Sequence, residues 1–400
     1  MNNVFKTNDK LVRFKSVNGC GINISWLHSL LKHARLNKNS IYVSLVDVSK
    51  AFNSVSHQSI VRLLTQNGAP SMLIDLIVDQ YNNVSTVINC AGEISGRIDI
   101  SSGAKQAGPL SSLLFNLVID ELFDVIQDQY GYVIDGIGST NARCFADNLT
   151  LVSSSRIGLN KLISLTTKER ELDVNPSKCI TIGMNKGYKG KKSKIETESI
   201  FSINDNMIPM LGYNNKTTRY LGVDFTSIGV VDVQKVKGKI SDALDKLERL
   251  KLKAQCKLDI LRLYVIPRFI FQLIHTDLYP DFLTKIDIQV GKMVKRILHL
   301  SMSTRNDFLY LPIREGGLQL MNIRETVSLS KIKLYKKITS GDDPVLRYLV
   351  QTQKSRIIDH FMINLNLEQS ISLNDVNQVK DKLVKDKQNS FVQKIHGVGF

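Results

Sequence analysis

Residues 142–152 read ARCFADNLTLV, and the rest of the chain can be interpreted around them. Apolar and β-branched residues on both sides of Ala146-Asp147-Asn148 predict a β-hairpin with a tight turn. Asn and Asp suit such turns because their short side chains bond the local backbone and tolerate left-handed dihedrals. The simpler interpretation is that Asp147 and Asn148 only make the turn. Alternatively, a carboxylate at a hairpin tip points out of the sheet and can reach a metal ion, which requires a second carboxylate from elsewhere in the chain.

That second carboxylate follows the run 41–46, IYVSLV. The run is too apolar and too β-branched for an exposed strand and predicts a central strand that is buried on both faces. Asp47 closes it. A carboxylate at the end of a buried strand is costly unless it is paired or bound to a metal ion. Asp47 is therefore the candidate partner of Asp147.

The composition bounds the class of protein. A chain of 400 residues that is 43% hydrophobic can form a large core and predicts two or three domains. The polar start does not resemble a signal peptide, and no apolar run reaches the roughly 18 residues of a membrane helix. The most apolar segment, 261–278, is interrupted by Arg262, Pro267 and Arg268. The five cysteines are scattered and form no zinc motif, which suits a reducing intracellular location.

The net charge of +16 is distributed unevenly. Residues 1–150 contain 12 Lys and Arg against 12 Asp and Glu, whereas the remaining 250 residues contain 41 against 25. A protein this basic usually binds a polyanion through phosphate contacts that release counterions. The alternative is a solvated basic surface. We expect the second half to hold a nucleic acid, and the first half to do something else.

The spacing of apolar residues and the positions of Gly, Pro and helix-capping residues indicate a mixed α/β part to about residue 228 and a basic helical part after it. The loop 102–111 contains Lys105, Gln106 and two glycines before a helix, a geometry that can accept a phosphate or a base edge but is a weak signal alone. Predicted helices in the first part are 22–37, 56–67 with Ser56 as cap, one starting at Pro70, 110–122 and 157–170. Predicted strands are 41–46, 84–90 with 96–101 as a hairpin, 142–152, 180–184 and 218–225. Predicted helices in the second part are 232–254, 257–278, 280–300, 322–338 and 373–391.

This order of elements fits a ferredoxin-like βαββαβ sheet. Adjacent strands of such a sheet can bring Asp47 and Asp147 side by side, where they repel each other unless a cation lies between them. Magnesium prefers a few carboxylate oxygens plus substrate phosphates. Two such ions about 3.5–4 Å apart can activate an attacking hydroxyl and stabilise a leaving pyrophosphate. The basic helical part makes a nucleic acid the expected substrate.

Four motifs then occur in a recognisable order and spacing. Val46–Phe52 with Val55-Ser56-His57, the loop 102–111, Phe145-Ala146-Asp147 and Val174–Cys179 resemble reverse-transcriptase motifs A, B, C and D. More specifically, these motifs resemble those of non-LTR (LINE-type) retrotransposons, especially the site-specific class with one C-terminal endonuclease. Weaker similarities extend it over nearly the whole chain: Asn18-Gly19-Cys20 to the fingers, Arg219–Gly222 to the primer grip, and 266–268 and 311–318 to the thumb and linker.

The resemblance implies an α+β right-hand polymerase: partial fingers at 1–40, a palm at 41–228, a helical thumb at 229–300 and a helical linker at 301–400. The last residues, 396–400, resemble the linker just before a C-terminal knuckle and endonuclease, so we expect a truncated copy. The implied activity is RNA-directed DNA synthesis by nucleotidyl transfer to a primer 3′-hydroxyl in target-primed retrotransposition. The implied partners are an RNA template, a DNA primer or target and dNTPs, with no membrane, in the nucleus.

The resemblance also assigns roles to single residues. Asp47 and Asp147 would hold Mg²⁺, with Mn²⁺ as a substitute and the Val48 carbonyl assisting, and Asn148 would complete the catalytic set. Phe52 would lie under the incoming sugar and exclude a 2′-hydroxyl, and Lys178 would lie near the triphosphate. The loop residues Lys105, Gln106, Ala107 and Gly108 would contact the template–nucleotide pair, and the primer grip would be Tyr220, Leu221 and Gly222.

Three departures change charge or backbone freedom. The family usually has Asp where this chain has Asn53, Gln-Gly-Asp-Pro where it has Gln106-Ala107-Gly108-Pro109, and a second Asp where it has Asn148. Ala107 places a Cβ where a glycine allows close approach, and Asn148 removes a negative charge beside the metal site. Two functions therefore stay open: a polymerase whose activity is impaired in this copy, or a catalytically silent, basic nucleic-acid-binding scaffold. A generic α/β protein would require the motif order to be coincidental.

Overall fold

The computed structural model describes residues 19–48, 56–82, 84–100, 103, 110–126, 128–168, 174–187, 193–212 and 216–368, with 372, 375, 376, 378, 379 and 383. The chain forms two compact units. The first comprises Met1–Asn23 and Leu31–Lys216, and the second comprises Ile24–Leu30 and Thr217–Phe400. In these described ranges, no helix has the length and apolar character needed to cross a membrane.

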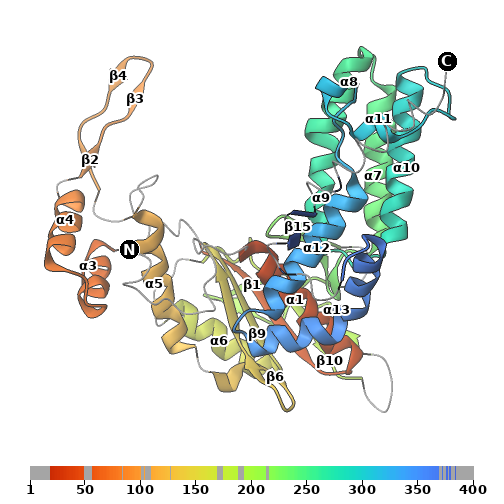
Figure 1. Ribbon diagram of the computed structural model, residues 1–400. Helices are drawn as coiled ribbons and strands as arrows, with labels where there is room; N and C mark the ends of the chain where they lie inside the picture. The colour runs from red at the N-terminus through yellow and green to blue at the C-terminus, as the bar shows by residue number, and fades with distance from the viewer. Residues whose placement is uncertain are drawn as a thin grey trace. The chain divides into compact units, whose positions relative to one another are not determined.

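The first unit is built on a five-stranded antiparallel sheet with the strand order β11-β10-β1-β9-β8 (Figure 1). β1 (Ile41–Asp47) is central, between β10 (Ile180–Asn185) and β9 (Asn148–Ser153). β8 (Ala142–Phe145) and β11 (Lys194–Ile195) lie outside them. The four long strands follow the chain as β1, helices, β8, β9, helix and β10, so the predicted ferredoxin-like βαββαβ arrangement is confirmed.

Helices cover this sheet and complete its core. α6 (Arg156–Lys168) packs on β1 and β9, and α5 (Ser111–Val125) packs on α6 and on α3 (His57–Gln66). The remaining helices of this part are α1 (Gly19–Leu36), whose middle belongs to the second unit, α4 (Ser71–Tyr81) and the short η1 (Asp128–Tyr130). All the helices predicted for this part of the chain are present. Ser56 precedes α3 as predicted, but its side chain makes no capping hydrogen bond, so that detail was wrong.

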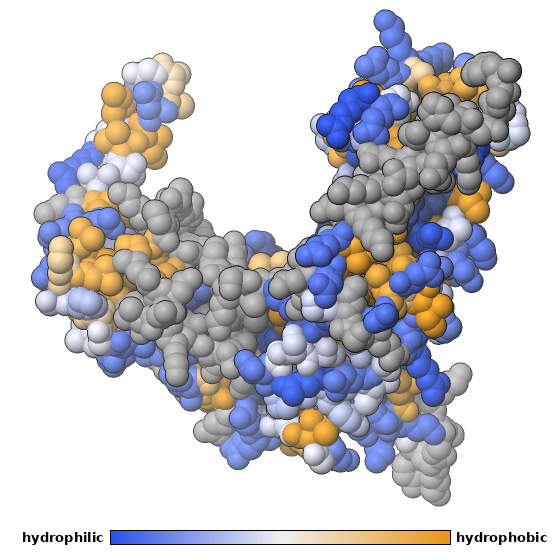
Figure 2. All heavy atoms as spheres, viewed as in Figure 1, coloured by the Kyte–Doolittle hydropathy of each residue, from blue (hydrophilic) through white to orange (hydrophobic). Residues whose placement is uncertain are grey.

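The predicted hairpin between α4 and α5 is also present. β2 (Ser85–Thr86) pairs with β5 (Ile98–Asp99), and β3 (Asn89–Cys90) pairs with β4 (Glu93–Ile94). Its turn, Ala91-Gly92, has φ angles of 52° and 95°, as the primed hairpin turns require. Ile88 and Ile94 on this hairpin are exposed, and Figure 2 shows the resulting apolar surface. Smaller hairpins are β6 (Tyr132–Ile134) with β7 (Gly138–Thr140), and β12 (Ser202–Ile203) with β13 (Asn206–Met207).

The second unit combines a small sheet with helices. The sheet is β14 (Thr218–Tyr220), β15 (Val223–Thr226) and β16 (Gly229–Val230). The helical elements are α7 (Val233–Arg249), α8 (Ala254–Ile260), a π-helical turn η3 (Leu261–Val265), α9 (Ile266–His275), α10 (Pro280–Ile297), α11 (Asp307–Tyr310), η4 (Ile313–Glu315), α12 (Ile323–Thr339) and α13 (Pro344–Asn364). The sequence predicted one helix at 257–278, which is divided at the π-turn, and it missed α13. The predicted helix 373–391 lies largely outside the described residues.

Candidate active site

The end of β1 lies against the turn of the β8–β9 hairpin. Asp47 pairs in register with Asn148, and the Val48 N–H donates to the Asp147 carbonyl at 3.1 Å. Asp47 and Asp147 therefore lie at one end of two adjacent strands. The sequence predicted this juxtaposition from a buried strand that ends in one carboxylate and a hairpin that carries the other.

The turn differs from the prediction in one residue. Phe145 pairs with Asn148, so only Ala146 and Asp147 form the turn, and Asn148 is the first residue of β9. Ala146, not Asn or Asp, takes the left-handed conformation with φ 56°. The prediction that Asn148 lies in the turn was wrong because the ladder with β1 and β8 fixes its backbone. The Asn148 Nδ2 donates to Asp147 Oδ1 at 3.1 Å.

A third segment, 174–179, joins the same end of β1. The Asn175 N–H donates to the Asp47 carbonyl at 3.3 Å. The Asn175 Oδ1 accepts the Ser177 N–H at 3.1 Å and the Ser177 hydroxyl at 2.7 Å, which closes an Asx turn. Asn175 belongs to the segment that resembles motif D, and its Asn-Pro pair is typical of such a turn. The turn carries Lys178, whose Nζ lies 3.7 Å from Asp47 Oδ1.

The next residue, Cys179, closes the turn from inside the core. Its thiol donates to the Asn175 carbonyl at 3.2 Å, and burial raises the pKa of this thiol. The thiol therefore stays neutral and fixes the turn without adding charge near Asp47.

The charged groups of this site are accessible to solvent. The Asp47 side chain is 31% exposed and the Lys178 side chain is 63% exposed. An exposed ion pair of this kind contributes at most about 1 kcal/mol. Lys178 can therefore leave Asp47 for a phosphate at little cost.

The donor set also fits a divalent cation that shares its ligands with substrate. In the part of the chain that the structure describes, no three His, Cys, Asp or Glu side chains gather into a metal-binding group. Two carboxylates at one strand end suit Mg²⁺, which keeps several waters or substrate oxygens and needs few protein ligands.

The remaining predicted site residues fall into two groups. Phe52, Asn53, Lys105, Gln106, Ala107 and Gly108 lie outside the described residues. Tyr220, Leu221 and Gly222 are described and belong to the second unit. Tyr220 ends β14 and pairs with Val223, and the β14–β15 turn consists of Leu221 with φ 46° and Gly222 with φ 85°. Tyr220 is buried and packs edge-on against Phe225, with ring centroids 5.7 Å apart.

Comparisons with known proteins agree with this geometry. Residues 5–225 match the family model described as reverse transcriptase (RNA-dependent DNA polymerase). The Pol polyprotein of the type-2 retrotransposable element R2DM of Drosophila melanogaster is 30% identical over 359 residues, which cover 88% of this chain and 34% of that protein. The Pol polyprotein of the type-1 retrotransposable element R2 of Nasonia vitripennis is 29% identical over 398 residues, which cover 96% of this chain and 38% of that protein.

This chain thus spans little more than a third of the length of either relative. Among solved structures, a Candida tropicalis telomerase in complex with a fragment of telomeric RNA is 11% identical, with a TM-score of 0.41 over 95% of this chain and 55% of that one. The family model covers more than half of the chain and includes Asp47, Asp147 and Lys178. The chain belongs to the reverse transcriptase (RNA-dependent DNA polymerase) family.

Proposed function

We propose that the chain is the RNA-directed DNA polymerase part of a non-LTR retrotransposon protein of the R2 type. The observation that carries the proposal is the meeting of Asp47 and Asp147 at one strand end, with Lys178 beside them. In this proposal the reaction is transfer of a nucleotide from a dNTP to a primer 3′-hydroxyl, copied from an RNA template during target-primed retrotransposition.

The reverse transcriptase family uses divalent cations, and we assign Mg²⁺, with Mn²⁺ as a substitute, to this site. Asp47, Asp147 and the Val48 carbonyl hold the ions. When bound, the ions supply Lewis-acid activation of the hydroxyl and neutralise charge on the leaving pyrophosphate. The Lys178 ammonium leaves Asp47, contacts the triphosphate of the dNTP and orients it. Asn148 supplies an amide where a carboxylate would strengthen cation binding.

The other assignments follow the family. Phe52 excludes a 2′-hydroxyl, the loop with Lys105, Gln106, Ala107 and Gly108 contacts the template–nucleotide pair, and Tyr220, Leu221 and Gly222 position the primer. The domain boundaries of the proposal are fingers to 40, palm 41–228, thumb 229–300 and linker 301–400. Target-primed synthesis takes place on chromosomal DNA, so we also assign the protein to the nucleus.

Primer extension by the full chain on an RNA template tests the proposal. We expect Mg²⁺-dependent product from the wild-type chain and none from Asp47→Ala or Asp147→Ala. The matched control is Asp135→Ala, because Asp135 is also an exposed carboxylate beside a hairpin turn of the first unit. Its loss should leave the product unchanged.

Two results would contradict the assignment. Product that persists in Asp147→Ala would remove that carboxylate from the mechanism. Absence of product from the wild-type chain at every Mg²⁺ and Mn²⁺ concentration, and from a variant with Asn148→Asp and Gly108→Asp, would exclude polymerase activity.

The Asn148 amide on Asp147 favours a second candidate, a catalytically silent nucleic-acid-binding scaffold, because it satisfies a carboxylate oxygen without metal. This candidate predicts salt-sensitive RNA binding that survives both Asp147→Ala and removal of divalent cations. Primer extension separates it from the polymerase, since only the polymerase makes product.

A further inference from the structure

The turn 175–178 holds Lys178 beside Asp47 through its backbone. The Lys178 N–H donates to the Asn175 carbonyl at 3.1 Å, which closes the turn, and Pro176 at its second position restricts the backbone there. The Asn175 N–H donates to the Asp47 carbonyl at 3.3 Å. Two backbone hydrogen bonds therefore connect the residue that carries the ammonium with the residue that carries the carboxylate.

The ion pair between these two side chains does not hold Lys178 in place. The Lys178 Nζ lies 3.7 Å from Asp47 Oδ1, and the Lys178 side chain is 63% exposed. Water screens a pair of this kind, and ordering the long lysine side chain costs entropy that offsets the attraction. The position of the ammonium therefore depends on where the turn places the start of the lysine side chain.

Asn175 is the residue on which this turn depends. Its carbonyl accepts three donors, because the Cys179 N–H at 3.3 Å and the Cys179 thiol at 3.2 Å join the Lys178 N–H. Its side-chain Oδ1 accepts the Ser177 N–H at 3.1 Å and the Ser177 hydroxyl at 2.7 Å. The backbone contacts do not depend on the side chain at position 175. The two contacts of Oδ1 require a short side chain with an acceptor, which asparagine supplies.

The other side of β1 is fixed independently of Asn175. The Val48 N–H donates to the Asp147 carbonyl at 3.1 Å, and the ladder between β1 and β9 continues to Asp47. Loss of the Asn175 side chain leaves these contacts intact, and it also leaves the backbone N–H that donates to Asp47. A substitution at position 175 can therefore loosen Lys178 without moving the two carboxylates.

We propose that Asn175 is a positioning residue for binding of the incoming nucleotide, and that it acts through Lys178. This inference rests on the proposed function, in which the Lys178 ammonium contacts the triphosphate of the dNTP. An ammonium that is already held near the site loses less conformational freedom when it binds the triphosphate. Asn175 therefore increases the affinity for dNTP and has little effect on the rate of the chemical step.

Equilibrium binding of a dNTP separates this role from chemistry. The probe is dUTP with a fluorophore on its base, added in Mg²⁺ to the full chain with a primer–template whose primer ends in a dideoxynucleotide. Asn175→Ala should weaken dUTP binding by about fivefold, which corresponds to the loss of a typical side-chain hydrogen bond. In primer extension, the KM for dNTP should rise by a similar factor, and kcat should change by less than about twofold.

Two further substitutions at position 175 test whether the turn carries the effect. Asn175→Ser keeps a short side chain that can accept the Ser177 N–H, so it should bind dUTP more tightly than Asn175→Ala. Asn175→Gln keeps the amide but is one methylene too long for the turn, so it should bind dUTP as weakly as Asn175→Ala. In a Lys178→Met background, Asn175→Ala should have no further effect on dUTP binding, because the side chain through which it acts is absent.

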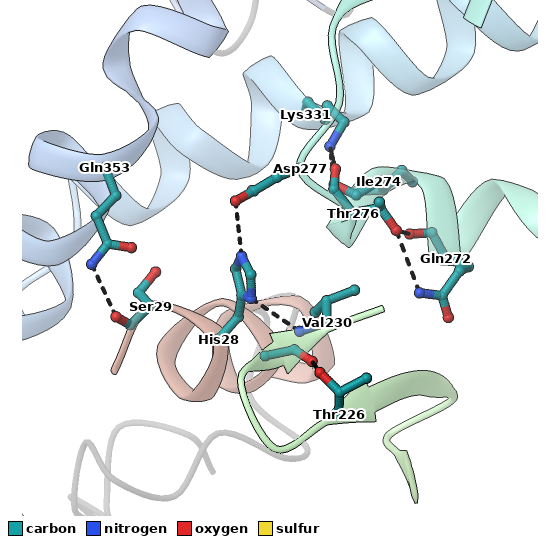
Figure 3. A network of polar contacts seen from close by, with 11 residues as sticks. His28, Ser29, Thr226, Val230, Gln272, Ile274, Thr276, Asp277, Lys331 and Gln353 are labelled. Carbon is teal, nitrogen blue, oxygen red and sulfur yellow. Dashed lines mark hydrogen bonds and ion pairs between the residues drawn. The ribbon is translucent and has the colours of Figure 1, made fainter. Parts of the chain in front are cut away.

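Thr226→Ala is the matched control, because Thr226 makes the same kind of turn contacts in the second unit. Its hydroxyl donates to the Gly229 carbonyl at 3.0 Å (Figure 3) and accepts the Ile228 N–H at 3.4 Å. Thr226→Ala should lower the Tm about as much as Asn175→Ala does, and it should leave dUTP binding unchanged.

Three results would overturn the proposal. They are equal dUTP affinity in Asn175→Ala and the wild type, equal affinity in Asn175→Ser and Asn175→Gln, and an undiminished effect of Asn175→Ala in the Lys178→Met background. The proposed function fails separately if the wild-type chain binds dUTP but extends no primer. Absence of dUTP binding by the wild-type chain would overturn both.

Discussion

Asn148 is the residue that we expect to limit cation binding most directly at the proposed site. Its amide donates to Asp147 Oδ1 at 3.1 Å. In Asn148→Asp this hydrogen bond is replaced by repulsion between two carboxylates, which costs about 1 kcal/mol without a cation. We expect a lower Tm in EDTA, a Tm that recovers in millimolar Mg²⁺, and primer extension that reaches half its maximum at a lower Mg²⁺ concentration than in the wild type.

The control for this prediction is Asn148→Ala, which removes the same donor without adding charge. It should lower the Tm equally with and without Mg²⁺. A response of Asn148→Asp to Mg²⁺ no larger than that of Asn148→Ala would show that position 148 does not contribute to cation binding.

We expect Asp287 to make the free energy of unfolding of the second unit depend on pH. Burial raises its pKa to about 6, although its carboxylate accepts the N–H groups of Arg324 and Ile323 at the start of α12. The native state therefore holds this proton more tightly than the unfolded state does. The free energy of unfolding should fall as the pH rises from about 4 to about 6, by about 3 kcal/mol for this group.

Urea unfolding between pH 4 and pH 7 measures this slope. Asp287→Asn cannot ionise and should flatten it, whatever its effect on stability at a single pH. Asp281→Asn, on the exposed side of the same helix, should keep the wild-type slope. An unchanged slope in Asp287→Asn would assign the pH dependence to other groups.

Single residues also mark the limit of what the sequence predicts at the site. The pairing of Asp47 with the hairpin was predictable because strand burial and turn position both follow from local pattern. The φ of Ala146 and the shift of Asn148 into β9 were not, because the register between β1 and β9 decides them. The contact of Lys178 with Asp47 depends on the Asn175 turn returning to β1, and only the motif resemblance pointed to it.

At the scale of elements, two helical features escaped the sequence patterns. α13 packs against both α12 and α10, so its apolar residues are not confined to one stripe and no clear period results. The start of α13 could have been predicted from the sequence. Asp343 caps the helix by accepting the Leu346 N–H at 2.8 Å, and Pro344 follows as the first helical residue. The predicted helix 257–278 is divided because Pro267 offers no N–H, and Ile266 instead donates to the Leu261 carbonyl in a π-turn.

The β15–β16 turn is the element most sensitive to one added methyl group. Gly229 has φ 124°, and a Cβ at this position would lie 2.6 Å from His28 Nδ1. Gly229→Ala should therefore cost about 1–3 kcal/mol in backbone strain and should also displace His28 from the Val230 N–H. Thermal unfolding measures the loss.

The matched substitution is Gly238→Ala on the exposed face of α7, where a Cβ would meet no heavy atom within 4 Å. It should stabilise the protein by about 0.5–1 kcal/mol, because alanine favours a helix over glycine. If both variants changed the Tm in the same direction, the strain and the contact with His28 would not be the cause.

At the scale of the whole molecule, the distribution of charge along the sequence was predictable, whereas the arrangement of the elements in the second unit was only partly predictable. All of the net charge of +16 belongs to residues 151–400, and the helical character of that half follows from apolar periodicity. The pattern gave no indication that strands β14 to β16 join the helices in the second unit. Their contacts are long-range in sequence, which local periodicity does not encode.

The charge asymmetry leads to a prediction about nucleic-acid binding, which rests on the proposed function. Four exposed basic residues gather at the end of α7: Lys246, Arg249, Lys251 and Lys253. Each phosphate contact contributes about −0.9 to the slope of log K against log salt for duplex DNA. Replacing all four with Gln should weaken binding of a labelled primer–template duplex and reduce the steepness of this slope by up to about 3.6. Fluorescence anisotropy between 50 and 300 mM KCl measures both quantities.

The control variants replace Arg35 and Lys38, which are exposed basic residues of the first unit, with Gln. They should change the slope by less than about 1. The opposite ranking would mean that the neutral half holds the duplex and that net charge does not identify the binding surface. A slope reduced without a loss of primer extension at low salt would separate duplex binding from chemistry, because Asp47 and Asp147 remain intact in both sets of variants.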